Sequence, residues 1–227
     1  MECFLYDNCN HKDCNAPVCL RRYKLEYLYN ASLLSGQQRK HLVLKIDEDG
    51  TDFEEFTKLA SIAQNIDTFV SEGQNLFLHS SVCGNGKSSW AIRMIEAYLN
   101  RIWPQADLSC KALFISVPRF LLALKEGISS HNTYAEYIKE NIMTADLVVW
   151  DDIAAKVGTE FELNHLLSLI EGRTSAGKSN IYTSNLNANE IKVALGDRVA
   201  SRVCNLSIDI ELHGKDKRNL GSQGGNK

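Results

Sequence analysis

The chain has 227 residues, of which 44% are hydrophobic and 23% are charged, and its formal net charge is −3. That length suits one domain, or one domain with a small appendage, and the hydrophobic fraction is enough for a core. The composition excludes wholesale disorder, and the slight negative charge excludes the global basic surface of a dedicated nucleic-acid binder. No apolar run is long enough to span a membrane and the N-terminus lacks the pattern of a signal peptide, so we expect a cytoplasmic protein.

Four cysteines lie within the first nineteen residues, at Cys3, Cys9, Cys14 and Cys19, and His11 lies among them. Four such ligands suit a tetrahedral Zn²⁺ site, in which His11 is an alternate ligand. A small segment with little hydrophobic core needs a bound metal or a similar crosslink to hold its fold. The spacing is not that of standard cysteine pairs two residues apart. Reduced thiols on a flexible tail are therefore the competing interpretation.

The next segment, residues 21–34, is expected to be a helix with apolar side chains around most of its circumference. Among them are Tyr23, Tyr27, Leu28 and Leu34. A lone helix cannot hide that much apolar surface, so it is expected to pack either on a partner protein or on the chain's own core. The polar and mixed residues that follow, up to residue 52, are interpreted as a connector.

From residue 53 onward, short apolar segments alternate with helical patterns. Helices are expected at residues 53–63, 87–100, 119–126 and around 163–170, and strands at residues 75–80, 112–116, 146–150, 180–184 and 206–212. In the last of these segments Leu206, Ile208, Ile210 and Leu212 alternate with polar residues, which is typical of a half-buried strand. The alternation of strands and helices predicts an α/β fold with a mostly parallel sheet between helices.

A glycine-rich loop, S-V-C-G-N-G-K-S, joins the first predicted strand to the helix that follows it. That context suits the phosphate-binding motif GxxxxGK[ST], in which backbone N–H groups and the helix N-terminus bind phosphate oxygens. Lys87 is expected to reach the β- and γ-phosphates of ATP, and Ser88 to coordinate Mg²⁺. The residues assigned to nucleotide binding are Ser81, Val82, Cys83, Gly84, Asn85, Gly86, Lys87, Ser88 and Ser89. Ser81 replaces the first glycine of the motif, and a chance glycine-rich turn is the alternative.

Two acidic residues, Asp151 and Asp152, end an apolar strand that follows the loop in the chain. Asp151 is expected to hold Mg²⁺, and Asp152 to polarise the attacking water, a role usually given to glutamate. Asn185 follows the next strand, where its amide can orient the water or sense the γ-phosphate. Simple turn residues are the alternative for all three.

Two arginines, Arg198 and Arg202, lie four residues apart on one face of a predicted helix. A solvated basic face is the usual explanation of such a pair. The other explanation is that they reach into a neighbour's nucleotide site as arginine fingers, which supply charge to the transition state.

Taken together, SSVCGNGKSS, LVVWDDIA, NIYTSNL and DRVASRV resemble the AAA+ ATPases of the helicase-loader group. That group includes DnaC, DnaI and their phage counterparts, and the IstB transposition helpers are close to it. The resemblance implies a P-loop core with a five-stranded parallel sheet and no C-terminal helical lid. It also implies that the strand ending at Asn185 lies between the loop strand and the Asp151 strand. Asn185 would then be the sensor, Arg202 the arginine finger supported by Arg198, and Arg218 a nucleotide contact.

The resemblance further implies the function of an ATP-dependent loader, encoded by a phage or a bacterium. Such a protein binds ATP or ADP with Mg²⁺, self-associates into a ring or spiral, and delivers a hexameric replicative helicase onto single-stranded DNA. Two alternatives stay open, an IstB-like ATPase on duplex DNA and an adaptor that hydrolyses little ATP. The expected domains are a zinc-binding and partner-binding region at 1–50, an AAA+ domain at 51–215 and a flexible tail at 216–227.

Overall fold

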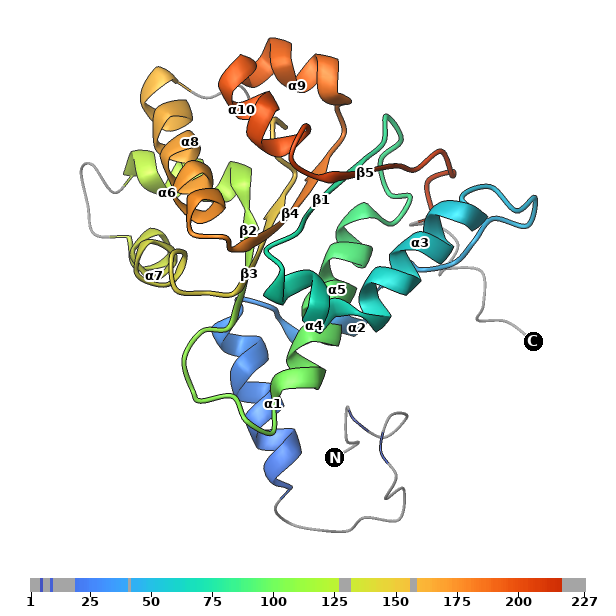
Figure 1. Cartoon of the computed structure of the whole chain (residues 1–227), viewed down its shortest axis with the longest axis vertical. Coiled ribbons are helices and arrows are strands. Elements are labelled where there is room, and N and C mark those ends of the chain that lie inside the picture. Colours follow the sequence, from blue (N-terminus) through green and yellow to red (C-terminus); the bar gives the residue numbers. More distant parts are fainter. Residues whose placement is uncertain are drawn as a thin grey trace.

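The computed structural model describes Leu5, Cys9 and residues 19–40, 42–126, 132–155 and 159–217. In these ranges five parallel strands form one sheet with helices on both faces (Figure 1). The strands are β1 (Asn75–His79), β2 (Ala112–Ser116), β3 (Leu147–Asp151), β4 (Ser179–Ser184) and β5 (Ile208–Glu211). Their spatial order is β2-β3-β4-β1-β5, so β4 lies between β1 and β3. The predicted α/β class, the parallel sheet and the place of β4 are confirmed.

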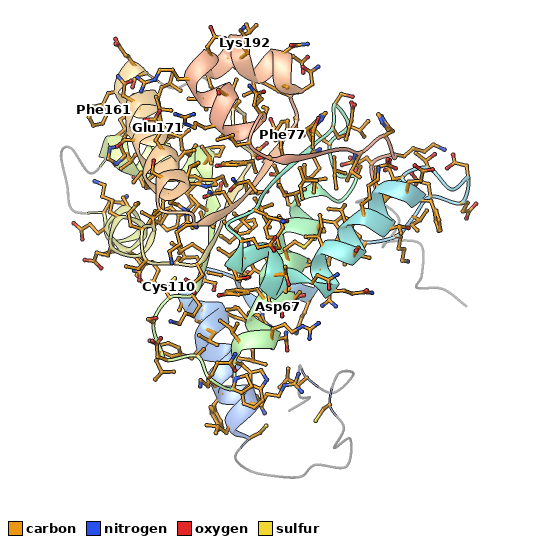
Figure 2. The ribbon with its side chains drawn as sticks, in the orientation of Figure 1. Asp67, Phe77, Cys110, Phe161, Glu171 and Lys192 are labelled. Atoms are coloured by element: carbon orange, nitrogen blue, oxygen red, sulfur yellow. The ribbon has the colours of Figure 1, made fainter. Side chains whose placement is uncertain are left out.

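Alternate side chains of the inner strands enter two separate hydrophobic cores, because successive strand residues point to opposite faces of a sheet. In β1, Phe77 belongs to one core, and Leu76 and Leu78 belong to the other. Figure 2 shows Phe77 in the middle of the molecule, within the sheet. The strands are therefore buried on both faces, as the unbroken apolar runs in the sequence indicate.

One face of the sheet is covered by the N-terminal helices and the other by the later ones (Figure 1). The first group is α1 (Leu20–Ala31), α3 (Phe53–Gln64), α4 (Ile66–Ser71) and α5 (Lys87–Ile102), with the short α2 (Gly36–Lys40) between α1 and α3 in the chain. The second group is α6 (Val117–Glu126), α7 (Thr133–Asn141), α8 (Glu160–Ser175), α9 (Ala188–Leu195) and α10 (Asp197–Val203). No helix in the described ranges is long and apolar enough to cross a membrane.

The first helix, α1, packs on the chain's own core, which is the second of the two alternatives posed by its sequence. Leu25, Leu28 and Tyr29 are buried against the core that α5 helps to form. Tyr23 and Tyr27 face outward and are 56% and 47% exposed. The apolar circumference of this helix is thus divided between a buried face and an exposed aromatic face.

The last strand departs from the prediction in its length and in its burial. It begins at Ile208 rather than at residue 206, and Leu206 and Ile208 are 47% and 42% exposed, while Ile210 and Leu212 are buried. The reason is that β5 is an edge strand, bonded to β1 alone in the described sheet. An alternating pattern identifies the strand but does not tell how completely neighbouring elements cover its apolar face.

A buried arginine joins α8 to the amino ends of β3 and β4. Arg173 has no exposed surface, and its guanidinium donates to the backbone oxygens of Ile142, Ala145 and Ser179. It also donates to Asn180 Oδ1 at 2.8 Å. Burial lowers the pKa of Arg173 to about 10, so the group stays charged at neutral pH. These hydrogen bonds satisfy carbonyl groups that would otherwise be buried without partners.

Candidate functional site

A cleft of about 450 Å³ opens at the carboxyl ends of β1, β3 and β4, where parallel sheets commonly bind ligands. It is lined by Val43, Cys83, Gly84, Gly86, Lys87, Ser88, Ser89, Asp151, Asp152, Thr183 and Asn185. The strand order explains this convergence, because β4 places Asn185 next to the acids that end β3. The structure thus brings together most of the nucleotide-site residues that the sequence predicts.

The glycine-rich loop runs from the end of β1 to the start of α5 at Lys87. Gly84 and Gly86 have φ angles of 75° and 115°, which lie in the region that glycine alone adopts without strain. A Cβ on Gly86 would also lie 2.7 Å from the carbonyl oxygen of Val43. This loop therefore requires glycine for backbone conformation at both positions, and at Gly86 for space as well.

The Lys87 ammonium group lies inside the curve of the loop. Nζ donates to the carbonyl oxygen of Val82 at 2.8 Å, to Asn85 Oδ1 at 3.3 Å and to the carbonyl oxygen of Ser80 at 3.4 Å. The residue is only 8% exposed. A buried cation surrounded by oxygen atoms at a helix N-terminus is a suitable partner for phosphate.

Asn85 supports the loop from behind instead of facing the cleft. Its side chain is fully buried, and Nδ2 donates to Ser80 Oγ at 2.7 Å and to the carbonyl oxygen of Leu212 at 3.4 Å. Ser81 and Val82 also lie outside the cleft lining in the described chain. The Asn85 amide group therefore shapes the loop, and only its backbone N–H is left to contact a nucleotide.

The two acidic residues at the end of β3 are held in place from β4 by Thr183. The Thr183 hydroxyl donates to Asp151 Oδ1 at 2.7 Å and accepts the N–H of Asp152 at 2.9 Å. Asn185 Nδ2 donates to Asp152 Oδ1 at 3.2 Å. Asp152 has a φ of 59°, which is uncommon for a residue other than glycine and concentrates at functional sites. Thr183 has no predicted role, although it stands in the same T-S-N segment as Asn185.

The Asp151 and Ser88 side chains are hydrogen-bonded to each other in the cleft, and both offer oxygen ligands of the kind that Mg²⁺ prefers. Burial raises the pKa of the Asp151 carboxyl above its ordinary value, and the negative charge of Asp152 acts in the same direction. Hydrogen bonds from Ser88 and Thr183 and the positive charge of Lys87 oppose that rise. A partly desolvated carboxylate beside a hydroxyl fits a Mg²⁺ ion, which would relieve the cost of burying the charge.

The segment interpreted as a connector forms one wall of the cleft. The N–H of Val43 donates to Ser89 Oγ at 2.9 Å, and Leu42 and Leu44 are partly buried against the core on the α5 side of the sheet. The short apolar run L-V-L within a polar stretch was the available signal for this packing. No motif marks it, because its contact with the loop is made through a backbone group.

Arg198 and Arg202 lie on α10, outside the cleft lining of their own chain in the part that the structure describes. Both approach one carboxylate oxygen, Glu171 Oε1 of α8, at 3.3 Å for Arg198 and 3.8 Å for Arg202. Glu171 lies on the side of α8 that faces α10 (Figure 2). The arginines are 75% and 41% exposed, so they are accessible to a second molecule. Glu171 was not predicted, since nothing in the sequence links it to the pair.

The predicted zinc ligands Cys3, His11 and Cys14 and the predicted nucleotide contact Arg218 lie outside the described residues. Cys9 and Cys19 are half-buried. Within the described ranges no three histidine, cysteine, aspartate or glutamate residues form a group that could hold a metal ion.

The five-stranded parallel sheet with its helices on both faces is the α/β fold of the DnaC and DnaI proteins. In sequence the chain is similar to the replicative helicase loader DnaC of Escherichia coli strain K12, with 24% identity over 127 residues. That match covers 56% of this chain and 49% of the relative, so the chain spans about half the length of DnaC. No family model matches the chain.

The solved structures that share this fold include the following three. A crystal structure of the DnaC helicase loader matches with a TM-score of 0.58 and 15% identity, over 82% of this chain and 98% of that one. The DnaI structure matches with a TM-score of 0.60 and 19% identity, over 82% of this chain and 94% of that one. The structure of AMPPCP-bound DnaA from Aquifex aeolicus matches with a TM-score of 0.56 and 16% identity, over 76% of this chain and 50% of that one.

Proposed function

We propose that this chain is an ATPase that loads a hexameric replicative helicase onto single-stranded DNA. The observation that carries the proposal is the convergence of Lys87 and Ser88 with Asp151, Asp152 and Asn185 in one cleft. The sequence similarity to DnaC supports the choice of a helicase as the partner. In this proposal the chain works in the bacterial cytoplasm, either for the host or for a phage.

The residues of the cleft divide the work of ATP hydrolysis among them. Lys87 and the N–H groups of the loop bind the phosphates, and Ser88 and Asp151 hold Mg²⁺, which neutralises phosphate charge when bound. Asp152 accepts a hydrogen bond from the attacking water and polarises it, and Asn185 fixes the direction of the Asp152 carboxylate. Because aspartate is shorter than glutamate, hydrolysis is expected to be slow until assembly completes the site.

Assembly supplies the remaining charge through α10 of a neighbouring copy. In the proposal Arg202 enters the cleft of the next chain and Arg198 supports it, which requires ATP-dependent self-association into a ring or spiral. Their separation from the cleft of their own chain and their exposure support this role. An arginine supplied by a neighbour typically accelerates phosphoryl transfer by about 10³–10⁵-fold.

The N-terminal region is proposed to bind the helicase. Its exposed tyrosines, Tyr23 and Tyr27, provide an aromatic surface on α1 of the kind that is enriched in interfaces. We further propose a structural Zn²⁺ bound by Cys3, Cys9, Cys14 and Cys19, with His11 as the alternate ligand. Zinc release measured colorimetrically should give about one equivalent per chain, because a structural site is filled. Less than half an equivalent would refute the zinc site.

The function is tested by native mass spectrometry of the chain with the host's replicative helicase, with and without ATP and Mg²⁺. A defined complex of several chains on one hexamer is expected. Lys87→Ala should abolish ATP binding and loading, whereas Lys58→Ala, at a side chain that is 61% exposed on α3, should leave both unchanged. Absence of a complex under both conditions, together with tighter binding to duplex than to single-stranded DNA, would replace this proposal with a transposition-helper role.

The arginine assignment has a separate test. Arg202→Ala should bind ATP normally but lose the rise in ATPase rate with protein concentration. Mixing it with Lys87→Ala should restore part of that rate, because each variant lacks a different half of a shared site. Normal concentration-dependent hydrolysis by Arg202→Ala would show that the arginine is not the finger.

A further inference from the structure

The segment that follows β5, residues 212–217, lies between the phosphate loop and the connector, and we call it the clasp. Figure 1 shows it as the red segment that runs from β5 toward the start of α3. Sequence reasoning placed its last two residues in a flexible tail, but Lys217 is only 3% exposed. Lys217 is anchored by partners far away in the sequence.

On one side the clasp holds the phosphate loop through the backbone. The N–H of Lys217 donates to the carbonyl oxygen of Gly84 at 3.0 Å. The carbonyl oxygen of Leu212 accepts from Asn85 Nδ2 at 3.4 Å. Both loop residues lie directly before Gly86 and Lys87, so the clasp contacts the part of the loop that is expected to surround phosphate.

On the other side the clasp holds the connector through two aspartates. The Asp52 carboxylate accepts the N–H groups of His213 and Gly214 at 2.7 and 2.8 Å. Asp47 Oδ2 accepts the N–H of Lys215 at 3.2 Å. Gly214 is tightly enclosed, because a Cβ there would lie 2.7 Å from an oxygen of each aspartate.

The Lys217 side chain completes the junction by entering the connector itself. Its ammonium nitrogen donates to the carbonyl oxygen of Lys45 at 2.7 Å and lies 3.6 Å from Asp47 Oδ1. It also lies 5.0 Å from the centre of the Phe56 ring, close enough for a cation–π contact. The side chain is 1% exposed, and a charge so deeply buried is tolerated only with such partners.

The connector also contacts the phosphate loop directly, through Val43. Its N–H binds Ser89 Oγ, and its carbonyl oxygen leaves no room for a side chain at Gly86. The loop is therefore flanked by two segments, and Lys217 contacts both the loop and the connector. A change in the geometry of the phosphate loop must therefore be accompanied by a change in the clasp and in the connector.

We propose that Lys217 is a positioning residue for the phosphate loop, and that it links nucleotide binding to the ordering of residues 42–52. Because those residues lead back to α1, the clasp carries the nucleotide state toward the N-terminal region. The proposal rests on the nucleotide-binding part of the proposed function and requires neither hydrolysis nor a helicase. Linkage is reciprocal, so a weakened connector must lower nucleotide affinity by the same factor by which nucleotide orders the connector.

The test is hydrogen exchange of peptides that cover residues 42–52, with and without Mg-ADP, together with calorimetric titration of Mg-ADP. In the wild-type chain Mg-ADP should slow exchange in these peptides. Lys217→Met keeps the apolar stem but removes the charge, and it should abolish that slowing and weaken Mg-ADP binding at least about fivefold. Lys217→Arg should recover part of both effects. Lys58→Met, at a side chain that is 61% exposed on α3, is the matched control and should behave as wild type.

Each outcome decides the proposal. Lys217→Met with wild-type affinity and a normal exchange response would overturn it. Wild-type chain that binds Mg-ADP without any change at residues 42–52 would also overturn it, without using a variant and while leaving the proposed nucleotide site intact. Wild-type chain that does not bind Mg-ADP would refute the proposed nucleotide site, and the linkage with it. If Lys217→Met fails to fold, Asp47→Asn addresses the same junction and should show the same loss.

Discussion

Thr183 fixes both acidic residues of the cleft from the neighbouring strand, so Thr183→Val tests how the cleft is organised. Valine has nearly the shape of threonine and an equal preference for strands. It can neither donate to the Asp151 carboxylate nor accept the N–H of Asp152. The substitution therefore removes two hydrogen bonds at a residue that is 1% exposed, with little change in packing.

The expected loss of unfolding free energy depends on whether the hydrogen-bond partner of Thr183 is charged or neutral. A hydrogen bond to a charged group contributes about 1.5–3 kcal/mol, and one between neutral groups about 0.5–1.5 kcal/mol. Part of the Asp151 carboxylate is open to the cleft, where water replaces the lost donor, so the total should lie near the lower end. We expect the free energy of unfolding to fall by about 2–3 kcal/mol, or about 5–10 °C in Tm for a chain of this size. Loss of the Thr183 donor also raises the pKa of Asp151 further.

Urea unfolding followed by circular dichroism measures the loss of stability, and calorimetric titration with ADP at several Mg²⁺ concentrations measures the effect on the site. Thr183→Ser keeps the hydroxyl group and serves as the control, with Mg²⁺ dependence close to that of wild type. If Thr183→Val unfolds within about 0.5 kcal/mol of wild type and retains its Mg²⁺ dependence, the two hydrogen bonds do not organise the acids.

Three further predictions concern the acid, the buried arginine and the loop glycine. Since burial raises the pKa of Asp151, the carboxylate is protonated at a higher pH than an ordinary aspartate, and Mg²⁺-dependent ADP binding should fall as the pH is lowered through that value. Titrations from neutral into acidic pH should show this fall, and Asp151→Asn should remove both the Mg²⁺ dependence and the pH effect. Arg173→Met should lower the free energy of unfolding by about 3–5 kcal/mol in urea, whereas Arg93→Met, at a side chain that is 46% exposed, should change it by less than about 0.5 kcal/mol. Gly86→Ala should displace Val43 and weaken Mg-ADP binding at least about tenfold, while Gly50→Ala, at a φ of 78° with open space around it, should cost only about 1–2 kcal/mol in stability.

Much of the fold was predictable because its signals are local. The strand at Ala112–Ser116 was predicted to the residue, and that at Asn75–His79 to within one residue, since short apolar runs bounded by polar residues mark buried strands. The loop glycines and the Asp151 and Asp152 pair could be recognised because their chemistry requires fixed residue types. The helix Thr133–Asn141 was not predicted, because it buries only Ala135 and Ile138 and so has little apolar pattern.

The features that were not predicted depend on partners distant in the sequence. Lys217 and Asp47 are surface residue types, and their burial arises only when the clasp meets the connector, although the two residues lie 170 positions apart in the chain. Glu171 is an ordinary helix residue until α10 brings Arg198 and Arg202 beside it. The roles of such residues are decided by tertiary packing, which no local pattern in a single sequence encodes.

The position of β1 in the sheet has a consequence for how the protein is made. Both of its neighbours, β4 and β5, come late in the chain, and Asn75 bonds to Asn180, 105 residues further on. At a translation speed of about 5–20 residues per second, β1 waits roughly 5–20 s for its first partner strand. The hydrogen bonds that hold Gly84 and Asn85 in place form later still, because their partners are Lys217 and Leu212. A ribosome must therefore synthesise the chain as far as Lys217 before the loop acquires its last supporting hydrogen bonds, so the loop is among the last parts of the fold to reach its final geometry.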